Sequence, residues 1–333
     1  MALARRMAVT LPAGPNLEQT IERLRWAEDN GFPDAWFSDS GAPDSITQVA
    51  AIAHHTKSIR IGIAVTPVYT RSPAVLAASA NVLGQVLPGR FIMGLGSSSQ
   101  TIMGQWNGIA LDKPVTRVRE TAEMVRSMLT GEKSAFDGAT LKSRGYRQAP
   151  LADPPPIYIA ALRSKMIEMA AEVGDGVIFN LWPKSALPKM MEHVKIGAER
   201  AGKNWEDVEI VNRAMVLTTD DKEHARNLFR AAFAPYYATP VYNKFLAWSG
   251  FDGPADTITE GWAEKDREKT TGALSDELID EIAIIGDEDE VRERIQSDAD
   301  GGVHTHIVAP MAATPEEMQR TFATFTADQF QLN

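Results

Sequence analysis

A strand–helix–strand pattern over residues 61–96 constrains the fold of this chain more than any other feature. The pattern begins with β-branched apolar residues (59–65), continues with a helix of small residues (74–85) and ends with an apolar run that closes on Gly94-Leu95-Gly96. Two strands joined in this way by a helix pair in parallel through a right-handed crossover. Ligand sites in such sheets lie beyond the carboxyl ends of the strands, where this sequence places polar and glycine residues.

The same alternation of apolar runs and longer amphipathic stretches continues along the chain. Strands are predicted at residues 6–11, 35–39, 59–65, 91–96, 157–161, 176–180, 208–218 and 304–309. Helices are predicted at residues 17–30, 45–55, 74–85, 115–129, 164–173, 185–201, 222–233 and 289–299. An open doubly wound sheet also alternates, but only a closed barrel gives a reason for eight units. The sequence therefore predicts an α/β protein whose (β/α)8 TIM barrel spans residues 1–333 as a single domain.

One long segment, at about residues 235–282, interrupts this pattern as an insertion before the last strand. Its aromatic side chains are Tyr236, Tyr237, Tyr242, Phe245, Trp248, Phe251 and Trp262. Loops of this length inside a compact domain are usually lids or binding loops. The segment is either a helical insertion that packs its aromatic residues onto the barrel or a lid over the substrate, and the two interpretations are compatible.

Composition limits the partners that we expect. The net charge of −10 argues against binding to nucleic acid, because non-specific binding depends on a basic surface. No run approaches the ~18 uninterrupted apolar residues that span a bilayer, and no leader of the secretory type is visible, so no membrane partner is expected. The absence of cysteine excludes disulfides and cysteine-bound metals. We expect a cytoplasmic protein.

Acidic residues concentrate at 276–293, with Asp287-Glu288-Asp289-Glu290 at the centre. Carboxylates at a helix start complement the helix dipole. This run is therefore predicted to form a solvated loop and the first turn of a helix.

The barrel rule assigns candidate site residues. Active sites of such barrels lie at the C-terminal ends of the strands, which selects Asp39, residues 64–66, the serines after Gly96, residues 160–164 and Asn180. Asp39 ends an apolar strand, where a carboxylate is costly unless it is paired or faces a ligand. It either faces a cofactor or caps the segment that follows.

Two loops could hold an anionic or carbonyl group. Ser97 and Ser98 could donate hydrogen bonds from their hydroxyls, although their loop lacks the spacing and the lysine of a nucleotide-binding loop. A better phosphate candidate joins a strand to a helix whose free amides face the ligand, with two cationic side chains nearby. It consists of Ala161, Leu162, Arg163, Ser164 and Lys165. The alternative is that Ser164 is an ordinary N-cap.

Several motifs, in order, resemble those of the luciferase-like oxidoreductase superfamily. They are Trp36-Phe37-Ser38-Asp39, Val65-Thr66-Pro67-Val68-Tyr69-Thr70-Arg71-Ser72-Pro73, Gly89-Arg90-Phe91, Gly94-Leu95-Gly96, and Ile157-Tyr158-Ile159-Ala160-Ala161 with Gly174-Asp175-Gly176. The chain is most similar to the branch that uses the deazaflavin coenzyme F420, such as methylenetetrahydromethanopterin reductase. The resemblance covers most of the chain and fades between about residues 233 and 282.

The resemblance implies a flavin-like ring at the barrel mouth. Ala64 and Val65 would lie behind the ring, where relatives carry a non-prolyl cis peptide, here at Ile63–Ala64 or Ala64–Val65. The other cofactor-binding candidates are Asp39, Thr66, Ser97, Ser98 and the phosphate loop 161–165. The acidic tail of F420 would favour a basic surface, for which Arg71, Arg163 and Lys165 are candidates.

Two positions depart from the sugar-phosphate dehydrogenases of this superfamily, which carry a histidine after the Asp39 position and a glutamate at the Ser99 position. Ser40 and Ser99 stand here, and neither is a competent general acid–base near neutral pH. No catalytic residue is assigned, and hydride transfer to or from an electrophilic carbon fits better. His304 and His306 share one strand face, but no third ligand is visible, so no metal is expected.

The resemblance thus implies an F420-dependent oxidoreductase that transfers a hydride between the deazaflavin and a small organic substrate. One alternative is an FMN-dependent monooxygenase that receives reduced flavin from a separate reductase. Another is a catalytically silent flavin-binding protein. Relatives are usually oligomers, so a homodimer or homotetramer is expected.

Overall fold

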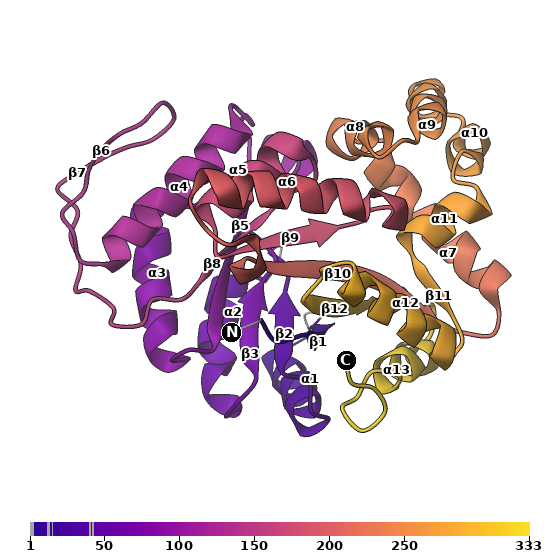
Figure 1. Ribbon diagram of the computed structural model, residues 1–333, viewed down its shortest axis with the longest axis horizontal. Helices are drawn as coiled ribbons and strands as arrows, with labels where there is room; N and C mark the ends of the chain where they lie inside the picture. Colours follow the sequence, from indigo (N-terminus) through magenta and orange to yellow (C-terminus); the bar gives the residue numbers. More distant parts are fainter. Residues whose placement is uncertain (1–2, 12–13, 15, 40, 42) are drawn as a thin grey trace.

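Parallel strands close into a barrel in the part of the chain that this computed structural model describes, residues 3–11, 14, 16–39, 41 and 43–333. The strands follow the order β12-β1-β2-β3-β5-β8-β9-β10, and β10 pairs again with β12 to close the ring (Figure 1). The predicted (β/α)8 barrel is confirmed.

The barrel strands are β1 (Arg6–Thr10), β2 (Asp34–Phe37), β3 (Arg60–Ile63), β5 (Phe91–Gly96), β8 (Ile157–Ala160), β9 (Gly176–Asn180), β10 (Glu209–Thr218) and β12 (Thr305–Pro310). The surrounding helices are α1 (Leu17–Asp29), α2 (Ser45–Ile52), α3 (Pro73–Val86), α4 (Pro114–Leu129), α5 (Ser164–Val173), α6 (Leu187–Arg200), α7 (Lys222–Tyr237), α12 (Glu288–Asp300) and α13 (Pro315–Ala323). Most bounds lie within two residues of those predicted. Among the elements that were not predicted are α13, the short strands β4 (Thr66–Pro67) and β11 (Ile284–Gly286), the hairpin β6 (Ala135–Asp137) and β7 (Lys142–Arg144), and a π-helical turn (Thr101–Trp106).

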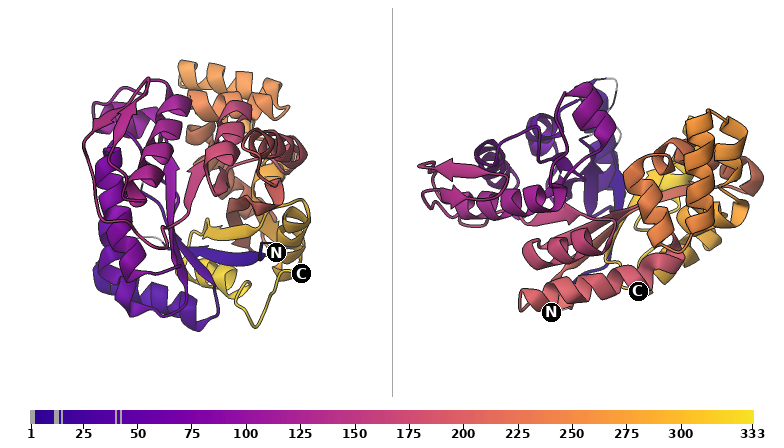
Figure 2. Two further views of the ribbon diagram at one scale, coloured as in Figure 1. Left: turned by 60° about the vertical axis from the view of Figure 1, so that its left-hand side comes forward. Right: turned by 90° about the horizontal axis from the view of Figure 1, so that it is seen from above.

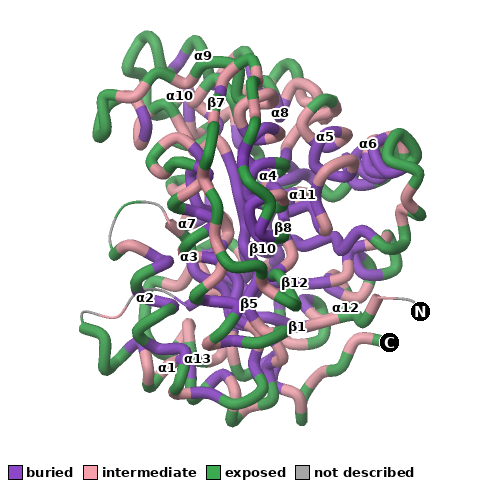
Figure 3. Tube along the Cα trace, turned by 90° about the vertical axis from the view of Figure 1, so that its left-hand side faces the viewer, coloured by how far each residue is buried: buried purple, intermediate pink, exposed green. Residues whose placement is uncertain are grey.

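Burial follows the barrel. Figure 3 shows the strands as a buried centre, with the exposed residues on the outer helices and loops. Inside the ring, an apolar layer is formed by Ala8, Trp36, Ile92, Tyr158, Ile178, Val211 and Ile307. No helix among the described residues is long and apolar enough to cross a membrane.

A charged cluster fills the N-terminal end of the barrel interior, below that layer. Arg60 donates to Asp34 Oδ1 at 2.8 Å and to Glu209 Oε1 at 2.9 Å. Glu209 also accepts from the hydroxyls of Tyr158 (2.5 Å) and Thr305 (2.6 Å). These hydrogen bonds join β2, β3, β8, β10 and β12, so one buried arginine links strands from both halves of the ring.

The segment 235–282 is helical. It contains the last turn of α7 and helices α8 (Pro240–Trp248), α9 (Asp252–Glu264), α10 (Arg267–Gly272) and α11 (Asp276–Ile282). Figure 2 shows α8 to α10 in orange on one side of the barrel, away from the indigo and magenta helices of the first half. The insertion begins after Tyr237 rather than at about residue 235 as predicted, because α7 continues through Pro235 to Tyr237. A proline in the last turn of a helix removes only one of the final backbone hydrogen bonds, so the helix can continue past it.

Aromatic residues attach the insertion to the barrel. Phe229, Phe233 and Tyr237 of α7 are fully buried in an apolar cluster that also contains Leu217 of β10. The hydroxyl of Tyr237 donates to the carbonyl of Leu181, after β9, at 2.6 Å. The segment is therefore helical and packs aromatic side chains on the barrel, whereas a role as a lid stays a prediction.

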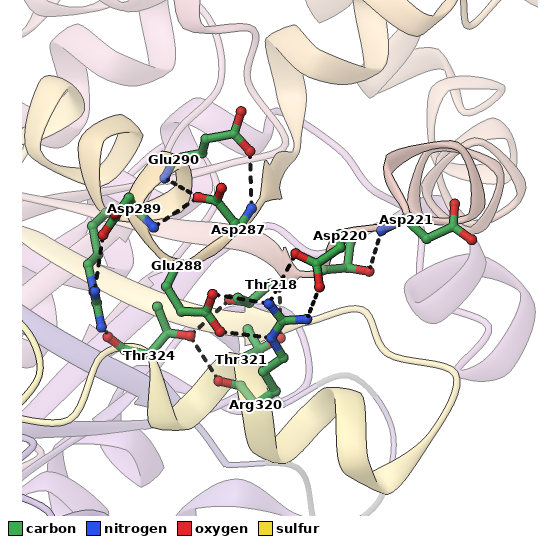
Figure 4. Close-up of polar contacts among 12 residues, drawn as sticks. Thr218, Asp220, Asp221, Asp287, Glu288, Asp289, Glu290, Arg320, Thr321 and Thr324 are labelled. Carbon is green, nitrogen blue, oxygen red and sulfur yellow. Dashed lines mark hydrogen bonds and ion pairs between the residues drawn. The ribbon is translucent and has the colours of Figure 1, made fainter.

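The acidic run begins a helix, as predicted. The carboxylate of Asp287 accepts from the amides of Asp289 and Glu290 in a capping box that starts α12. Glu288 pairs with Arg320 of α13 (2.8 Å), and Arg320 also contacts Asp220 (3.0 Å), which follows β10 (Figure 4). The cluster in Figure 4 therefore ties the last two helices to the end of a barrel strand.

Candidate active site

The predicted site residues follow the C-terminal ends of four strands that are neighbours in the ring, β2, β3, β5 and β8. Parallel strands place these ends at one edge of the sheet. Asp39 follows β2; Ala64, Val65 and Thr66 follow β3; Ser97 and Ser98 follow β5; and residues 161–165 follow β8. Ser40 lies outside the described residues.

The chain leaves the sheet after β3 and rejoins it two residues later. The amide of Ala64 still donates to Phe37 of β2 (2.7 Å), the Ala64–Val65 peptide is cis, and Thr66 pairs with Leu95 of β5. The cis bond is thus at the second of the two positions that the resemblance implied. Ala64 and Val65 pack against the apolar layer inside the barrel. Their bulge forms the wall of the barrel mouth at this strand.

Gly94 and Gly96 of β5 make room for this bulge. A Cβ at Gly94 would lie 1.8 Å from the carbonyl oxygen of Ile63, and a Cβ at Gly96 would lie 2.4 Å from Val65 Cγ2. The space beside each glycine is filled by the chain itself, so the glycines act on a ligand only through the shape of the bulge.

Asp39 is paired rather than free. Arg71 donates to Asp39 Oδ2 at 2.9 Å and also pairs with Asp44. Burial raises the pKa of Asp39, although the Arg71 guanidinium opposes the shift. Asp44 is the N-cap of α2 and accepts from the amide of Thr47. The backbone amide of Ser45, the first residue of α2, donates to Asp39, so the role of Asp39 in capping the segment that follows stays a prediction beside the cofactor-facing role. Arg71 is shared by two carboxylates, and its charge therefore offers less to an acidic ligand than the sequence indicated.

The serine loop after β5 is partly engaged in its own structure. Ser98 has a left-handed backbone (φ 63°), and the hydroxyl of Ser99 accepts from the amide of Ile102 at 3.2 Å. Ser97 contacts only the carbonyl of Ser98, at 3.5 Å. The hydroxyl of Thr66, on β4, is buried and has no hydrogen-bond partner. Ser97, Ser98 and Thr66 carry hydroxyls in this region that retain capacity for a ligand.

The connection from β8 to α5 divides into two parts. The amide of Ala161 donates to Ile178 of β9 (3.0 Å) and Leu162 packs against the core, so both belong to the barrel wall. Arg163, not Ser164, is the N-cap residue, and no side chain caps the helix. The prediction of Ser164 as the N-cap is wrong, because Ser164 is already helical. The amides of Ser164 and Lys165 precede the first helical hydrogen bonds and can bind an anion.

The histidine pair belongs to the barrel wall. His304 Nδ1 accepts from the amide of Ile210 (3.0 Å), and His306 is fully buried, which lowers its pKa to about 3. Thr305 and Ile307, between and beyond them, point into the ring, so the histidines face the helices. Among the described residues, no three histidine, aspartate or glutamate side chains are grouped to hold a metal ion.

Sequence reasoning missed one residue at the mouth, Arg213. It lies within the apolar run of β10, beside Asn180 of β9, and its guanidinium contacts Met215 Sδ at 3.2 Å. A charged side chain two residues after the inward-facing Val211 was the signal that could have identified it.

A barrel with a bulged third strand, a serine loop and an open helix start after β8 defines a class of enzyme. The chain matches the luciferase-like monooxygenase family over residues 1–305 and belongs to that family. It is therefore a luciferase-like oxidoreductase.

Within this family, the chain is similar to several proteins that are named as reductases. The chain is 30% identical over 310 residues to the 5,10-methylenetetrahydromethanopterin reductase of Methanolobus tindarius, covering 92% of this chain and 94% of the relative. The enzyme of the same name from Archaeoglobus fulgidus is 28% identical over 299 residues, covering 88% and 90%. The coenzyme F420-dependent tetrahydromethanopterin reductase of Methanopyrus kandleri has the same fold, with a TM-score of 0.80, 22% identity and coverage of 97% and 98%.

Proposed function

We propose that this protein is an F420-dependent oxidoreductase that transfers a hydride between the deazaflavin and a small organic substrate. The observation that carries the proposal is the bulge of Ala64 and Val65 between β3 and β4, which lies at the same end of the barrel as the open start of α5. The similarity to reductases over most of both chains favours F420 over FMN.

The residues present fit such a cofactor. The unpartnered Thr66 hydroxyl, which is buried beside the bulge, is a hydrogen-bond donor that no protein group uses. Ser97 and Ser98 lie on the next strand end and could hydrogen-bond ring carbonyls. The amides of Ser164 and Lys165, with the charges of Arg163 and Lys165, suit a phosphate. Asp39 and Arg71 would hold the loop after β2 in place.

When bound, the deazaflavin supplies hydride transfer, and the protein supplies position and shielding from water. The bulge would orient one face of the ring, and the apolar layer beneath it would exclude water from that side. Neither Ser40 nor Ser99 carries a side chain that can act as a general acid near neutral pH, so proton transfer by these residues is not part of the proposal.

The test is a titration of the purified protein with F420 and, separately, with FMN, followed by fluorescence quenching. We expect F420 to bind at least about a hundredfold more tightly, which corresponds to about 2.7 kcal/mol. The reverse preference would indicate an FMN-dependent monooxygenase supplied by a separate reductase. Tight binding of either cofactor without turnover of model enones or imines would indicate a silent flavin-binding protein.

A matched variant pair adds a structural control. Lys165→Met removes a charge at the start of α5, and Lys195→Met removes one from α6, on the outside of the barrel. We expect only the first to weaken F420 binding, by about three- to tenfold. Assembly as a homodimer or homotetramer and a cytoplasmic location stay part of this proposal.

A further inference from the structure

Arg213 points into the mouth of the barrel. Side chains alternate along a strand, and Val211 belongs to the apolar layer inside the ring, so Arg213 faces the same way one step nearer the C-terminal end. The register agrees, because Arg213 lies beside Asn180, two residues beyond the interior residue Ile178.

Its strand lies opposite the bulge. In the closed order of strands, four steps separate β10 from β3 in either direction around the ring. Arg213 therefore faces, across the mouth, the Ala64–Val65 bulge that follows β3. A molecule that rests against the bulge would lie between the two, so this inference rests on the proposed function for that molecule.

The charge of Arg213 is not compensated within the described chain. No carboxylate there lies within ion-pair distance of the guanidinium, and the hydrogen bond to Met215 Sδ is to a weak acceptor. Burial lowers the pKa of Arg213, with the phenols of Tyr236 and Tyr242 as the titratable groups that face it. Beside it, Asn180 donates to the Tyr242 hydroxyl at 2.8 Å and leaves its Oδ1 without a partner.

Arg60 provides the internal comparison. It is the arginine at the opposite end of the barrel interior, and it is neutralised by Asp34 and Glu209. Arg213 is partly buried, and a guanidinium that is largely removed from water without such partners is costly, because its desolvation is not offset by an ion pair. The unpaired charge of Arg213 at the barrel mouth has a functional explanation if a bound ligand supplies the negative counter-charge.

We propose that Arg213 binds a carboxylate of the substrate, so that the natural substrate is a small organic acid anion. A single guanidinium matches one negative charge, and its planar fork matches the two oxygens of a carboxylate. The phenols of Tyr236 and Tyr242 would lie against the same group from the insertion. The acid would then present its reactive carbon towards the bulge on the opposite wall.

The test uses the chain without cofactor and does not depend on turnover. Protein labelled with nitrogen-15 arginine is titrated with sodium benzoate and with neutral benzamide at constant ionic strength, while the side-chain Nε–H signal of Arg213 is followed. The signal is assigned by its loss in Arg213→Met. We expect a saturable shift with benzoate and none with benzamide. Equal responses, or no response to benzoate, would overturn the proposal.

Variants separate an anion site from a structural role. Arg213→Met should weaken benzoate binding roughly tenfold or more, and Arg213→Lys should give an intermediate loss because the charge stays and the fork is gone. The control is Arg267→Met, at an exposed position on α10, which should bind as the wild type does. We expect Arg213→Met to keep or raise Tm, since an uncompensated charge is removed. A lower Tm with unchanged benzoate binding would show a structural role and refute the proposal.

Because F420 is absent from this titration, the two proposals can fail separately. Benzoate binding without F420 binding would retain the anion site and reject the cofactor. F420 binding without a benzoate response would retain the cofactor and reject the anion site.

Discussion

Among the described glycines, Gly94 is the one at which an added methyl group would make the shortest contact with its surroundings. Its missing Cβ would overlap the carbonyl oxygen of Ile63, at 1.8 Å, and a backbone atom cannot turn aside as a flexible side chain can. We expect Gly94→Ala to lower the free energy of unfolding by about 3 kcal/mol or more. It should also weaken cofactor binding, because the bulge moves. Chemical denaturation and the F420 titration measure the two effects.

The control for that substitution is Gly253→Ala in α9, where an added Cβ meets nothing within 4 Å. Its free energy of unfolding should stay the same or rise by about 0.5–1 kcal/mol, since alanine has the better helix propensity. Equal losses in the two variants would mean that the contact with Ile63 does not explain the effect at Gly94.

Individual site residues were predictable only as far as their position on a strand determines their surroundings. Asp39, Thr66 and the serines after β5 follow from the rule that strand ends carry the site. The partners of Asp39 did not follow, because Arg71 reaches it from a loop 32 residues away in the sequence. Arg213 was missed because it interrupts an otherwise apolar run that was interpreted as a buried strand.

At the scale of elements, Tyr237 joins the insertion to the barrel. Its hydroxyl is buried and donates to the Leu181 carbonyl at 2.6 Å. Tyr237→Phe leaves that carbonyl without a partner, so we expect the free energy of unfolding to fall by about 1–3 kcal/mol. Tyr236→Phe is the neighbouring control, since Tyr236 is 50% exposed, and its change should stay within about 0.5 kcal/mol. Urea unfolding of both variants decides whether the buried hydroxyl holds the insertion in place.

Helix and strand bounds were predictable where local chemistry marks the ends. Helix α5 was predicted at its observed residues, and α12 within one residue, because acidic and capping residues mark its start. The insertion could not be drawn in advance, since α8 to α11 are positioned by contacts with α7 and with each other rather than by a strand that follows each helix. Helix α13 was missed although Thr314 and Glu317 form a capping box that the sequence displays.

For the whole molecule, Arg60 links both halves of the barrel from within. Arg60→Met would leave Glu209 buried without its counter-charge and would leave Asp34 with only Arg6, at 3.4 Å, which should cost about 3–5 kcal/mol. The control Lys142→Met removes a pair with Asp137 that is about three-quarters exposed, and it should change stability by less than about 1 kcal/mol. Denaturant unfolding at pH 7 compares the two variants.

The pH dependence of that loss has a definite sign. Burial raises the pKa of Asp34 even beside Arg60, whereas for Glu209 burial is outweighed by hydrogen bonds from Arg60, and the pKa is lowered. Without Arg60, burial would raise both pKa values above those of the unfolded chain, so the folded variant binds more protons. Its stability must then fall as pH rises. The gap to the wild type should widen from pH 5 to pH 8, and a constant gap would refute this assignment.

The filled lower end of the barrel has a consequence for the order of events in a reaction. Arg60 and its carboxylates close the N-terminal end of the barrel interior, so the mouth is the single opening in the described part of the chain. Every molecule that enters through the mouth must also leave through it. If a cofactor binds against Ala64 and an organic acid binds to Arg213, both ligands pass through the barrel mouth. The one that lies deeper must arrive first and depart last. A barrel that is closed at its lower end therefore imposes an ordered sequence of binding and release on the two ligands.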